Sequence, residues 1–227
     1  LDSRSRLTVW STAPGAADGA AAAAGWGVAA EEAGQGILFV GNSYTYGNQL
    51  PKIVEALLKA GGQENSCSMS TRGGYSLKKH YLDKIVSSQI LSQKFQIVIL
   101  QDQSLTPVVY PRTTLSYAGK FIKEAKMAKT RPLLFMTWAY LKPKHKNMQE
   151  KLAITYSKAA HAYGAEVAPV GLAWQKALKE KPKLRLHTGD NSHPNIKGSY
   201  LAACVFYATI TQKSPLGLPH QLKVNNR

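Results

Sequence analysis

The stretch from Gly36 to Gly47 constrains the fold of this 227-residue chain more than any other. Its four consecutive apolar residues, Ile37 to Val40, are typical of a parallel strand that is covered on both faces. Gly41 then permits a tight turn, and Ser43 follows at the carboxyl end of the strand. Reacting groups collect at this end of open α/β sheets, because the next helix presents its free N–H groups there. Ser43 is therefore either a nucleophile or the cap of that helix.

Apolar runs alternate with helical patterns along the rest of the chain. Strands that alternate with helices at this spacing form right-handed βαβ units, so the sequence predicts an α/β fold with a parallel sheet between two helical layers. Besides 37–40, the predicted strands are 66–71, 95–100, 132–137 and 166–171, and the predicted helices are 50–60, 77–86, 113–129, 148–163 and 197–211.

Composition divides the chain into three predicted parts. Residues 1–35 are rich in alanine and glycine, which is typical of a low-complexity leader, either a degenerate secretion signal or a linker. Residues 36–217 form the predicted domain, and 218–227 form a C-terminal tail. Both a cytoplasmic and an exported location stay open. No apolar run reaches the roughly 18 to 20 residues of a membrane span, so no span is predicted.

The charge balance favours anionic partners. Lys and Arg total 29 against 13 Asp and Glu, a formal net charge of +16. Most lysines recur at the spacing of solvated helix faces, so charge alone does not define a function. Cys67 and Cys204 are the only cysteines in the sequence, too few for a disulfide framework or a zinc cluster built from Cys alone. The oligomeric state cannot be read from these features.

Two further strand ends carry glycine or polar residues. The strand at 66–71 is followed by Gly73 and Gly74, a pair that permits positive φ and a close approach of backbone N–H groups to whatever lies above the sheet. The strand at 95–100 runs into Gln101-Asp102-Gln103-Ser104. Since carboxyl ends of parallel strands meet at one edge, these groups are expected near Ser43.

His193 is the best candidate base among the six histidines. Pro194 biases it toward an extended conformation, and Gly189 and Asn191 tighten the preceding loop. Asp190, three residues earlier, can turn back onto the imidazole. A serine nucleophile needs such a base with an orienting carboxylate. The alternative is an Asx-turn followed by a histidine at a helix entry.

In these motifs the chain resembles the SGNH (GDSL-like) hydrolase superfamily over residues 36–217. The resemblance rests on Gly41-Asn42-Ser43, on Gly74 and on Asp190-Asn191-Ser192-His193, and the wider pattern is similar to that of a largely uncharacterised bacterial subgroup. It implies a flavodoxin-like three-layer α/β/α sandwich of about five parallel strands, an acyl-serine mechanism, and no metal or cofactor.

The resemblance also implies roles for individual residues. Ser43, His193 and Asp190 would form the catalytic triad, and the oxyanion donors would be the N–H groups of Ser43 and Gly74 with the amide of Gln101. The family usually has Gly-x-Asn-Asp after the third strand, where this chain has Gln101-Asp102-Gln103, so Gln103 is the alternative donor. Asn42 replaces the usual Asp beside the nucleophile.

The predicted activity is hydrolysis of a small-molecule or carbohydrate ester with a short acyl group, such as O-acetyl. Asn42, Gln103 and Trp138 are candidate substrate-binding residues, since a tryptophan can stack on a sugar. The alternative is a non-catalytic module that holds acidic polysaccharide or another anionic polymer on its basic surface. The Gly-x-Ser-x-Gly elbow of α/β-hydrolases is excluded by Thr45, and phosphate-loop and dinucleotide motifs are absent from the sequence, so no specific nucleic-acid or nucleotide partner is predicted.

Overall fold

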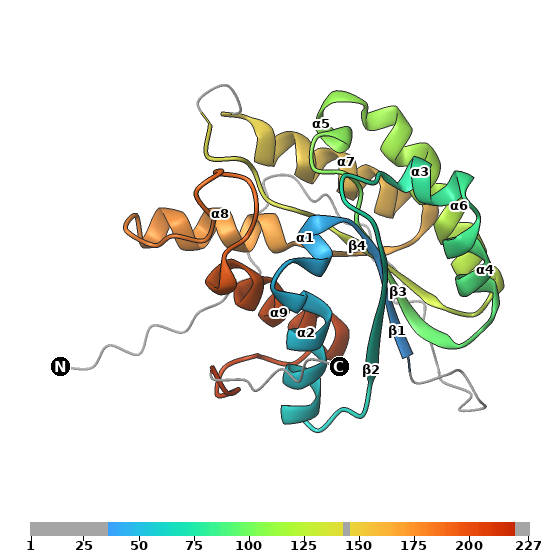
Figure 1. The fold of residues 1–227 in the computed structure, drawn as a ribbon, viewed down its shortest axis with the longest axis horizontal. Helices are drawn as coiled ribbons and strands as arrows, with labels where there is room; N and C mark the ends of the chain where they lie inside the picture. Colours follow the sequence, from blue (N-terminus) through green and yellow to red (C-terminus); the bar gives the residue numbers. More distant parts are fainter. Residues whose placement is uncertain (1–35, 143–145, 221–227) are drawn as a thin grey trace, which may run out of the picture. The chain divides into compact units, whose positions relative to one another are not determined.

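The computed structural model of the chain describes residues 36–142 and 146–220. The predicted leader, residues 1–35, and positions 221–227 of the predicted tail lie outside the described residues. The described chain forms a five-stranded, wholly parallel sheet (Figure 1). Its strands, in the spatial order β2-β1-β3-β4-β5, are β1 (Gly36–Gly41), β2 (Ser66–Thr71), β3 (Phe95–Leu100), β4 (Arg131–Phe135) and β5 (Glu166–Ala168).

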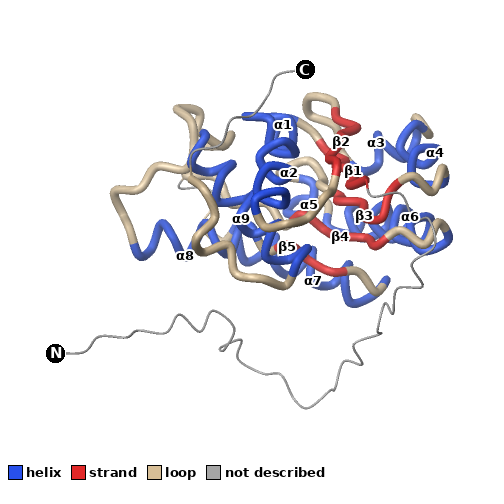
Figure 2. The backbone as a smooth tube through the Cα atoms, turned by 90° about the horizontal axis from the view of Figure 1, so that it is seen from below, coloured by secondary structure: helices blue, strands red, loops and turns tan. Residues whose placement is uncertain are grey.

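Helices cover both faces of this sheet (Figure 2). One layer contains α2 (Leu50–Ala60), α8 (Val170–Glu180) and α9 (Ile196–Thr211), and the other contains α3 (Leu77–Leu82), α4 (Ile85–Leu91), α6 (Pro111–Met127) and α7 (Met148–Tyr163). Short helical turns lie at the sheet edge: α1 (Ser43–Tyr46), the 3₁₀ turn η1 (Gly47–Gln49) and α5 (Thr106–Val109). The predicted three-layer α/β/α sandwich is confirmed.

Strand β1 shows why the sequence folds in this way. Successive side chains of a strand point to opposite faces, so Ile37 and Phe39 join the core under α2 and α9, whereas Leu38 and Val40 join the core under α4 and α6. All four are fully buried. A continuous apolar run is what a strand between two helical layers requires.

The strand order places the crevice of the fold beside β1. The chain passes from β1 outward to β2 and then back to β3 on the other side, so the direction of winding reverses between β1 and β3. Ligands of open α/β sheets bind outside the carboxyl ends of the strands at such a reversal. Ser43 follows β1 and Gln101 follows β3, so both lie at this point.

Several predicted elements differ from the structure: the strand predicted over 132–137 is β4 (Arg131–Phe135), the helix predicted over 113–129 is α6 (Pro111–Met127), and α8 was not predicted. Two further differences have a clear backbone cause. The helix predicted over 77–86 is divided into α3 and α4, because Lys84 has a left-handed backbone with φ 63°. The strand predicted over 166–171 ends at Ala168, because Pro169 has no N–H for the ladder and α8 begins at Val170. Within the described ranges, no helix has the length and apolar character needed to cross a membrane.

Candidate active site

The structure brings Ser43, His193 and Asp190 into one hydrogen-bonded chain. Ser43 is the first residue of α1, and its Oγ lies 2.8 Å from Nε2 of His193 although 150 residues separate them. The other ring nitrogen of His193, Nδ1, donates to a carboxylate oxygen of Asp190. Nδ1 therefore carries the proton, which leaves the Nε2 lone pair to accept from the serine hydroxyl.

Asp190 is held as a carboxylate despite its exposed position. Its second oxygen, Oδ1, accepts from the N–H groups of Ser192 and His193 and from the Thr188 hydroxyl, at 2.8 to 2.9 Å. Partial desolvation opposes ionisation, but the bonds from His193, from these N–H groups and from Thr188 outweigh it and hold the pKa of Asp190 well below its usual range. The group beside His193 is thus an anion throughout the neutral range.

The loop that carries both residues is fixed to the sheet by hydrogen bonds. Within residues 186–195, which we call the His193 loop, His187 and Pro194 form a β-bridge, and the Thr188 N–H donates to the His193 carbonyl at 2.8 Å. The Nε1–H of Trp138 donates to the Ser192 carbonyl at 2.9 Å, and the Asn48 side chain donates to the Pro194 carbonyl at 3.0 Å. These bonds set the height of the imidazole over Ser43.

A stack of aromatic rings supports the same loop from the core. The ring of Trp138 lies between those of Tyr44 and Trp174, with centroid separations of 4.6 and 4.0 Å and nearly parallel planes. Tyr44 also packs edge-on against His193, and its hydroxyl shares a hydrogen bond of 2.6 Å with that of Ser192. Trp138 is 1 % exposed and supports the His193 loop, and it also lines a neighbouring cavity, so the substrate-binding role predicted for it stays a prediction.

Gln101 lies beneath the nucleophile turn. Its Oε1 accepts from the Asn42 N–H at 3.0 Å and from the Thr45 hydroxyl at 2.9 Å, and its amide nitrogen donates to the Asp102 carbonyl. A Cβ at Gly41 would lie 2.3 Å from this Oε1, so only glycine allows the approach. Because Gln101 is wholly buried, its amide is not presented to a substrate oxygen. The structure therefore shows Gln101 positioning the nucleophile turn, and the oxyanion role predicted for it stays a prediction.

The side chain of Asn42 likewise forms its hydrogen bonds within the protein. Its side-chain oxygen accepts from the Tyr44 N–H and caps α1, and its amide nitrogen donates to the Tyr75 carbonyl at 2.9 Å. Only 3 % of Asn42 is exposed. These bonds give Asn42 a structural role, in which it joins the Ser43 turn to the Gly74 turn, and the substrate contact predicted for it stays a prediction.

The other predicted donors face solvent. Gly74 is exposed with φ 67°, and Ser43 is half-buried at the start of α1. Within residues 36–142 and 146–220, neither backbone N–H has a hydrogen-bond partner. Gln103 is half-buried: its Oε1 accepts from the N–H of Leu105 at 2.8 Å, and its amide nitrogen lies 3.2 Å from the Ser104 hydroxyl. Gln103 thus has a more accessible amide than Gln101.

Two supporting residues escaped the sequence analysis. Asp102 is 1 % exposed and accepts from the Leu77 and Gln103 N–H groups and from the Thr114 hydroxyl, at 2.6 to 2.9 Å. Burial raises its pKa, although these three bonds act in the opposite direction. The other residue, His80 on α3, is buried and donates from Nε2 to the Gly41 carbonyl at 2.8 Å. Burial is also the main cause that lowers its pKa. Helical spacing on α3, with Leu77 three residues before His80, was the only signal that His80 points inward.

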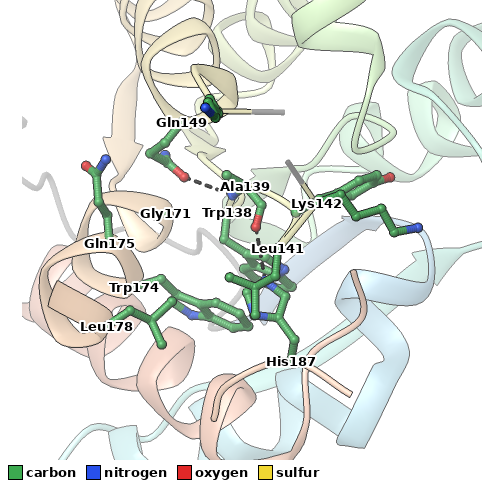
Figure 3. A pocket seen from close by; sticks show the side chains of 12 residues that line it. Trp138, Ala139, Leu141, Lys142, Gln149, Gly171, Trp174, Gln175, Leu178 and His187 are labelled. Atoms are coloured by element: carbon green, nitrogen blue, oxygen red, sulfur yellow. Dashed lines mark hydrogen bonds between the residues drawn. The ribbon is translucent and has the colours of Figure 1, made fainter. Parts of the chain in front are cut away.

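A cavity of about 380 Å³ lies beside this site (Figure 3). Ala139 lies between two side chains there: its N–H donates to Gln149 and its carbonyl accepts from His187. Ser43, Asp190 and His193 do not line this cavity. In the described part of the chain, no group of three or more His, Cys, Asp or Glu side chains is arranged to hold a metal ion.

Solved structures share this fold. A protein from Slackia heliotrinireducens assigned to the SGNH hydrolases is 26 % identical, with a TM-score of 0.69 over 78 % of this chain and 99 % of that one. A DUF4886 family protein from Bacteroides uniformis is 20 % identical, with a TM-score of 0.65 over 83 % and 87 % of the two chains. The acetylxylan esterase Axe2 from Geobacillus stearothermophilus is 16 % identical, with a TM-score of 0.64 over 78 % and 94 %.

These similarities agree with the motifs. Comparisons with protein families and with curated protein sequences give no significant match. The chain has the α/β/α fold of the SGNH (GDSL-like) hydrolase superfamily, as Gly41-Asn42-Ser43 and Asp190-Asn191-Ser192-His193 predicted. Several of its structural neighbours have names of hydrolases, among them a GDSL-like lipase, an acetylxylan esterase and a lipase/acylhydrolase.

Proposed function

We propose that the protein is a serine esterase that hydrolyses an ester of a short acid through an acyl-serine intermediate. The observation that carries this proposal is the hydrogen-bonded chain from Ser43 Oγ through His193 to Asp190, with 2.8 Å between Oγ and Nε2. A serine hydroxyl is a weak nucleophile until a base takes its proton, and this geometry supplies both the base and the group that orients it.

In the first half of the proposed reaction, Ser43 Oγ attacks the ester carbonyl while its proton passes to His193 Nε2. The imidazolium that forms is stabilised by the Asp190 carboxylate, which stays ionised because its pKa is held low. His193 then gives the proton to the leaving alcohol as the carbonyl–oxygen bond breaks. The acyl group remains on Ser43.

In the second half, water attacks the acyl-serine carbonyl and gives its proton to His193. The tetrahedral intermediate collapses, the acid leaves, and Ser43 Oγ takes the proton back. The Ser43 and Gly74 N–H groups are the proposed donors to the oxyanion in both halves, because both are accessible and neither is bonded within the described residues. Gln103 is the proposed third donor in place of Gln101.

The proposed substrate is an acetylated carbohydrate. The acetylxylan esterase among the structural neighbours supports this class. The stacked Trp138 and Trp174 are buried and support the His193 loop. A sugar would then be recognised by the polar rim around Ser43 and not by a tryptophan.

The test uses a fluorophosphonate probe and p-nitrophenyl acetate. We expect the probe to label Ser43 and the Ser43→Ala variant to lose both labelling and turnover. Ser68→Ala is the matched control, because Ser68 is an exposed serine on the edge strand β2 and should leave both unchanged. Full turnover by the Ser43→Ala variant would overturn the proposal.

A further inference from the structure

The turn after β2 brings a group of basic and aromatic side chains to the rim of the proposed site. Thr71 pairs with Gly41 in the sheet, and the N–H of Arg72 donates to the Gly41 carbonyl at 3.2 Å, two residues before Ser43. The Tyr75 carbonyl accepts from Asn42, the residue next to Ser43. Arg72 and Tyr75 therefore flank Gly74 within the turn that faces the nucleophile.

The side chains of this turn are ordered around the Tyr75 ring. The Arg72 guanidinium donates to the Tyr75 hydroxyl at 2.9 Å and lies 5.3 Å from the ring centroid. The ammonium group of Lys79, on α3, lies 5.5 Å from the same centroid. Buried His80 packs edge-on against the ring at 5.0 Å. We call Arg72, Tyr75 and Lys79 the Tyr75 cluster.

The positive charge of this cluster is largely uncompensated. Among the described residues, Lys79 has no acidic partner, and Arg72 has only Asp83 at 3.9 Å, with more than half of the Arg72 side chain exposed. Lys52 and Lys176 differ in this respect, because they pair with Glu55 and Glu180 along their own helices. Two cations held by one ring beside the proposed nucleophile make a preorganised site for an anion.

We propose that the Tyr75 cluster binds a carboxylate on the alcohol part of the ester, so that the enzyme prefers acetylated uronic acids to acetylated neutral sugars. This inference rests on the proposed esterase function. The planar fork of Arg72 suits a carboxylate, and Lys79 adds a second charge. An exposed ion pair contributes a factor of roughly 1.5 to 5 in binding, so two together give roughly 2- to 25-fold, with roughly 10-fold inside this range.

The test compares two substrates that differ only at C6: the acetylated methyl glycosides of galacturonic acid and of galactose. We expect the wild type to favour the uronate by roughly 10-fold in kcat/KM at low salt, and less at high salt because the exposed charges are screened. The double variant Arg72→Gln/Lys79→Gln should bring the ratio close to unity. Lys176→Gln, which removes a remote lysine of the same charge, should keep the wild-type ratio.

A wild-type ratio near unity, or a ratio that survives the double substitution, would overturn the inference. A stronger preference for the galactose 6-sulfate analogue than for the uronate would overturn the assignment to carboxylates. A separate measurement isolates this inference from the proposed reaction: titration of methyl galacturonate and methyl galactoside into the Ser43→Ala variant. Selective uronate binding that the double substitution abolishes supports the Tyr75 cluster even if no ester is hydrolysed, and equal binding contradicts it.

Discussion

Two polar regions hold the turn around Ser43, and they differ in exposure. Gln101 and Asp102, which we call the buried pair, are 0 % and 1 % exposed at the end of β3. Asp190 and His193, the exposed pair, have side chains that are 47 % and 44 % exposed in the His193 loop. The buried pair forms its hydrogen bonds with backbone and hydroxyl groups of the protein. In the exposed pair, the lone pair of His193 Nε2 is directed at the Ser43 hydroxyl.

The two carboxylates respond to these environments in opposite directions. Burial raises the pKa of Asp102, whereas hydrogen bonds to the charged form outweigh desolvation and lower the pKa of Asp190. When the environments of two acids shift their pKa values in opposite directions, the two acids are suited to different roles. The difference teaches that Asp190 is suited to stabilise a transient imidazolium, and Asp102 to hold the turns that carry the proposed oxyanion donors.

The largest effect is expected at the exposed pair. Asp190→Asn should lower kcat for p-nitrophenyl acetate by about 10⁴-fold, because the amide no longer favours the tautomer with the proton on Nδ1. The free energy of unfolding at neutral pH should fall only modestly, because the carboxylate that accepts from Ser192, His193 and Thr188 is solvent-exposed. Steady-state kinetics and urea denaturation measure the two quantities. A variant with near wild-type kcat would show that Asp190 does not orient His193.

A second prediction separates Gln101 from Gln103. Gln101→Ala should lower the free energy of unfolding by about 2 to 4 kcal/mol, because it leaves the Asn42 N–H and the Thr45 hydroxyl unpaired in the core. Gln103→Ala should instead lower kcat by about 10² to 10³-fold, as expected for loss of an oxyanion donor. Denaturation and kinetics on both variants form a matched comparison.

The reverse pattern would restore the role that the sequence predicted for Gln101. A Gln101→Ala variant that unfolds like the wild type but loses kcat would make Gln101 the donor, through a movement of its side chain. In that case Gln103→Ala should retain most of the activity, and its effect should be limited to the cap of α5.

The smallest effect is expected in the pH dependence of stability. The pKa of Asp102 is raised, so the folded state holds its proton more tightly than the unfolded state. This stabilisation is fully present below the ordinary value of 3.8 and is lost as pH rises through the folded-state pKa. The unfolding free energy of wild type minus that of Asp102→Asn should therefore fall with rising pH, by about 1.4 kcal/mol for each unit of pKa shift.

Asp190→Asn supplies the matched control for that measurement. The Asp190 pKa is lowered, so its contribution to stability is present above 3.8 and lost as pH falls through the folded-state pKa. The corresponding difference should therefore rise with pH, the opposite slope. Denaturant titrations between about pH 2 and 7 measure both slopes, that of Asp190 below about pH 4 and that of Asp102 above it. Slopes of the same sign would contradict the assigned environments.

Much of the frame was predictable from local sequence. Strands β2 and β3 match their predicted ranges, because period and apolar content are properties of a few consecutive residues. The contact between Asp190 and His193 was also predictable, since three residues of a tight loop suffice to form it. The position of Ser43 followed from the strand that precedes it.

The sequence by itself determined the alternation of strands and helices, the polar ends of β1 and β3, and the local Asp190–His193 pair, because each depends on neighbours in the chain. Only the tertiary structure decided which polar groups form their hydrogen bonds inside the protein. Gln101 accepts a hydrogen bond from the N–H of Asn42, 59 residues away in the sequence. The indole N–H of Trp138 donates to the Ser192 carbonyl, 54 residues away. Whether an amide or an indole meets a substrate depends on the packing that surrounds it, and that packing comes from segments far apart in the sequence.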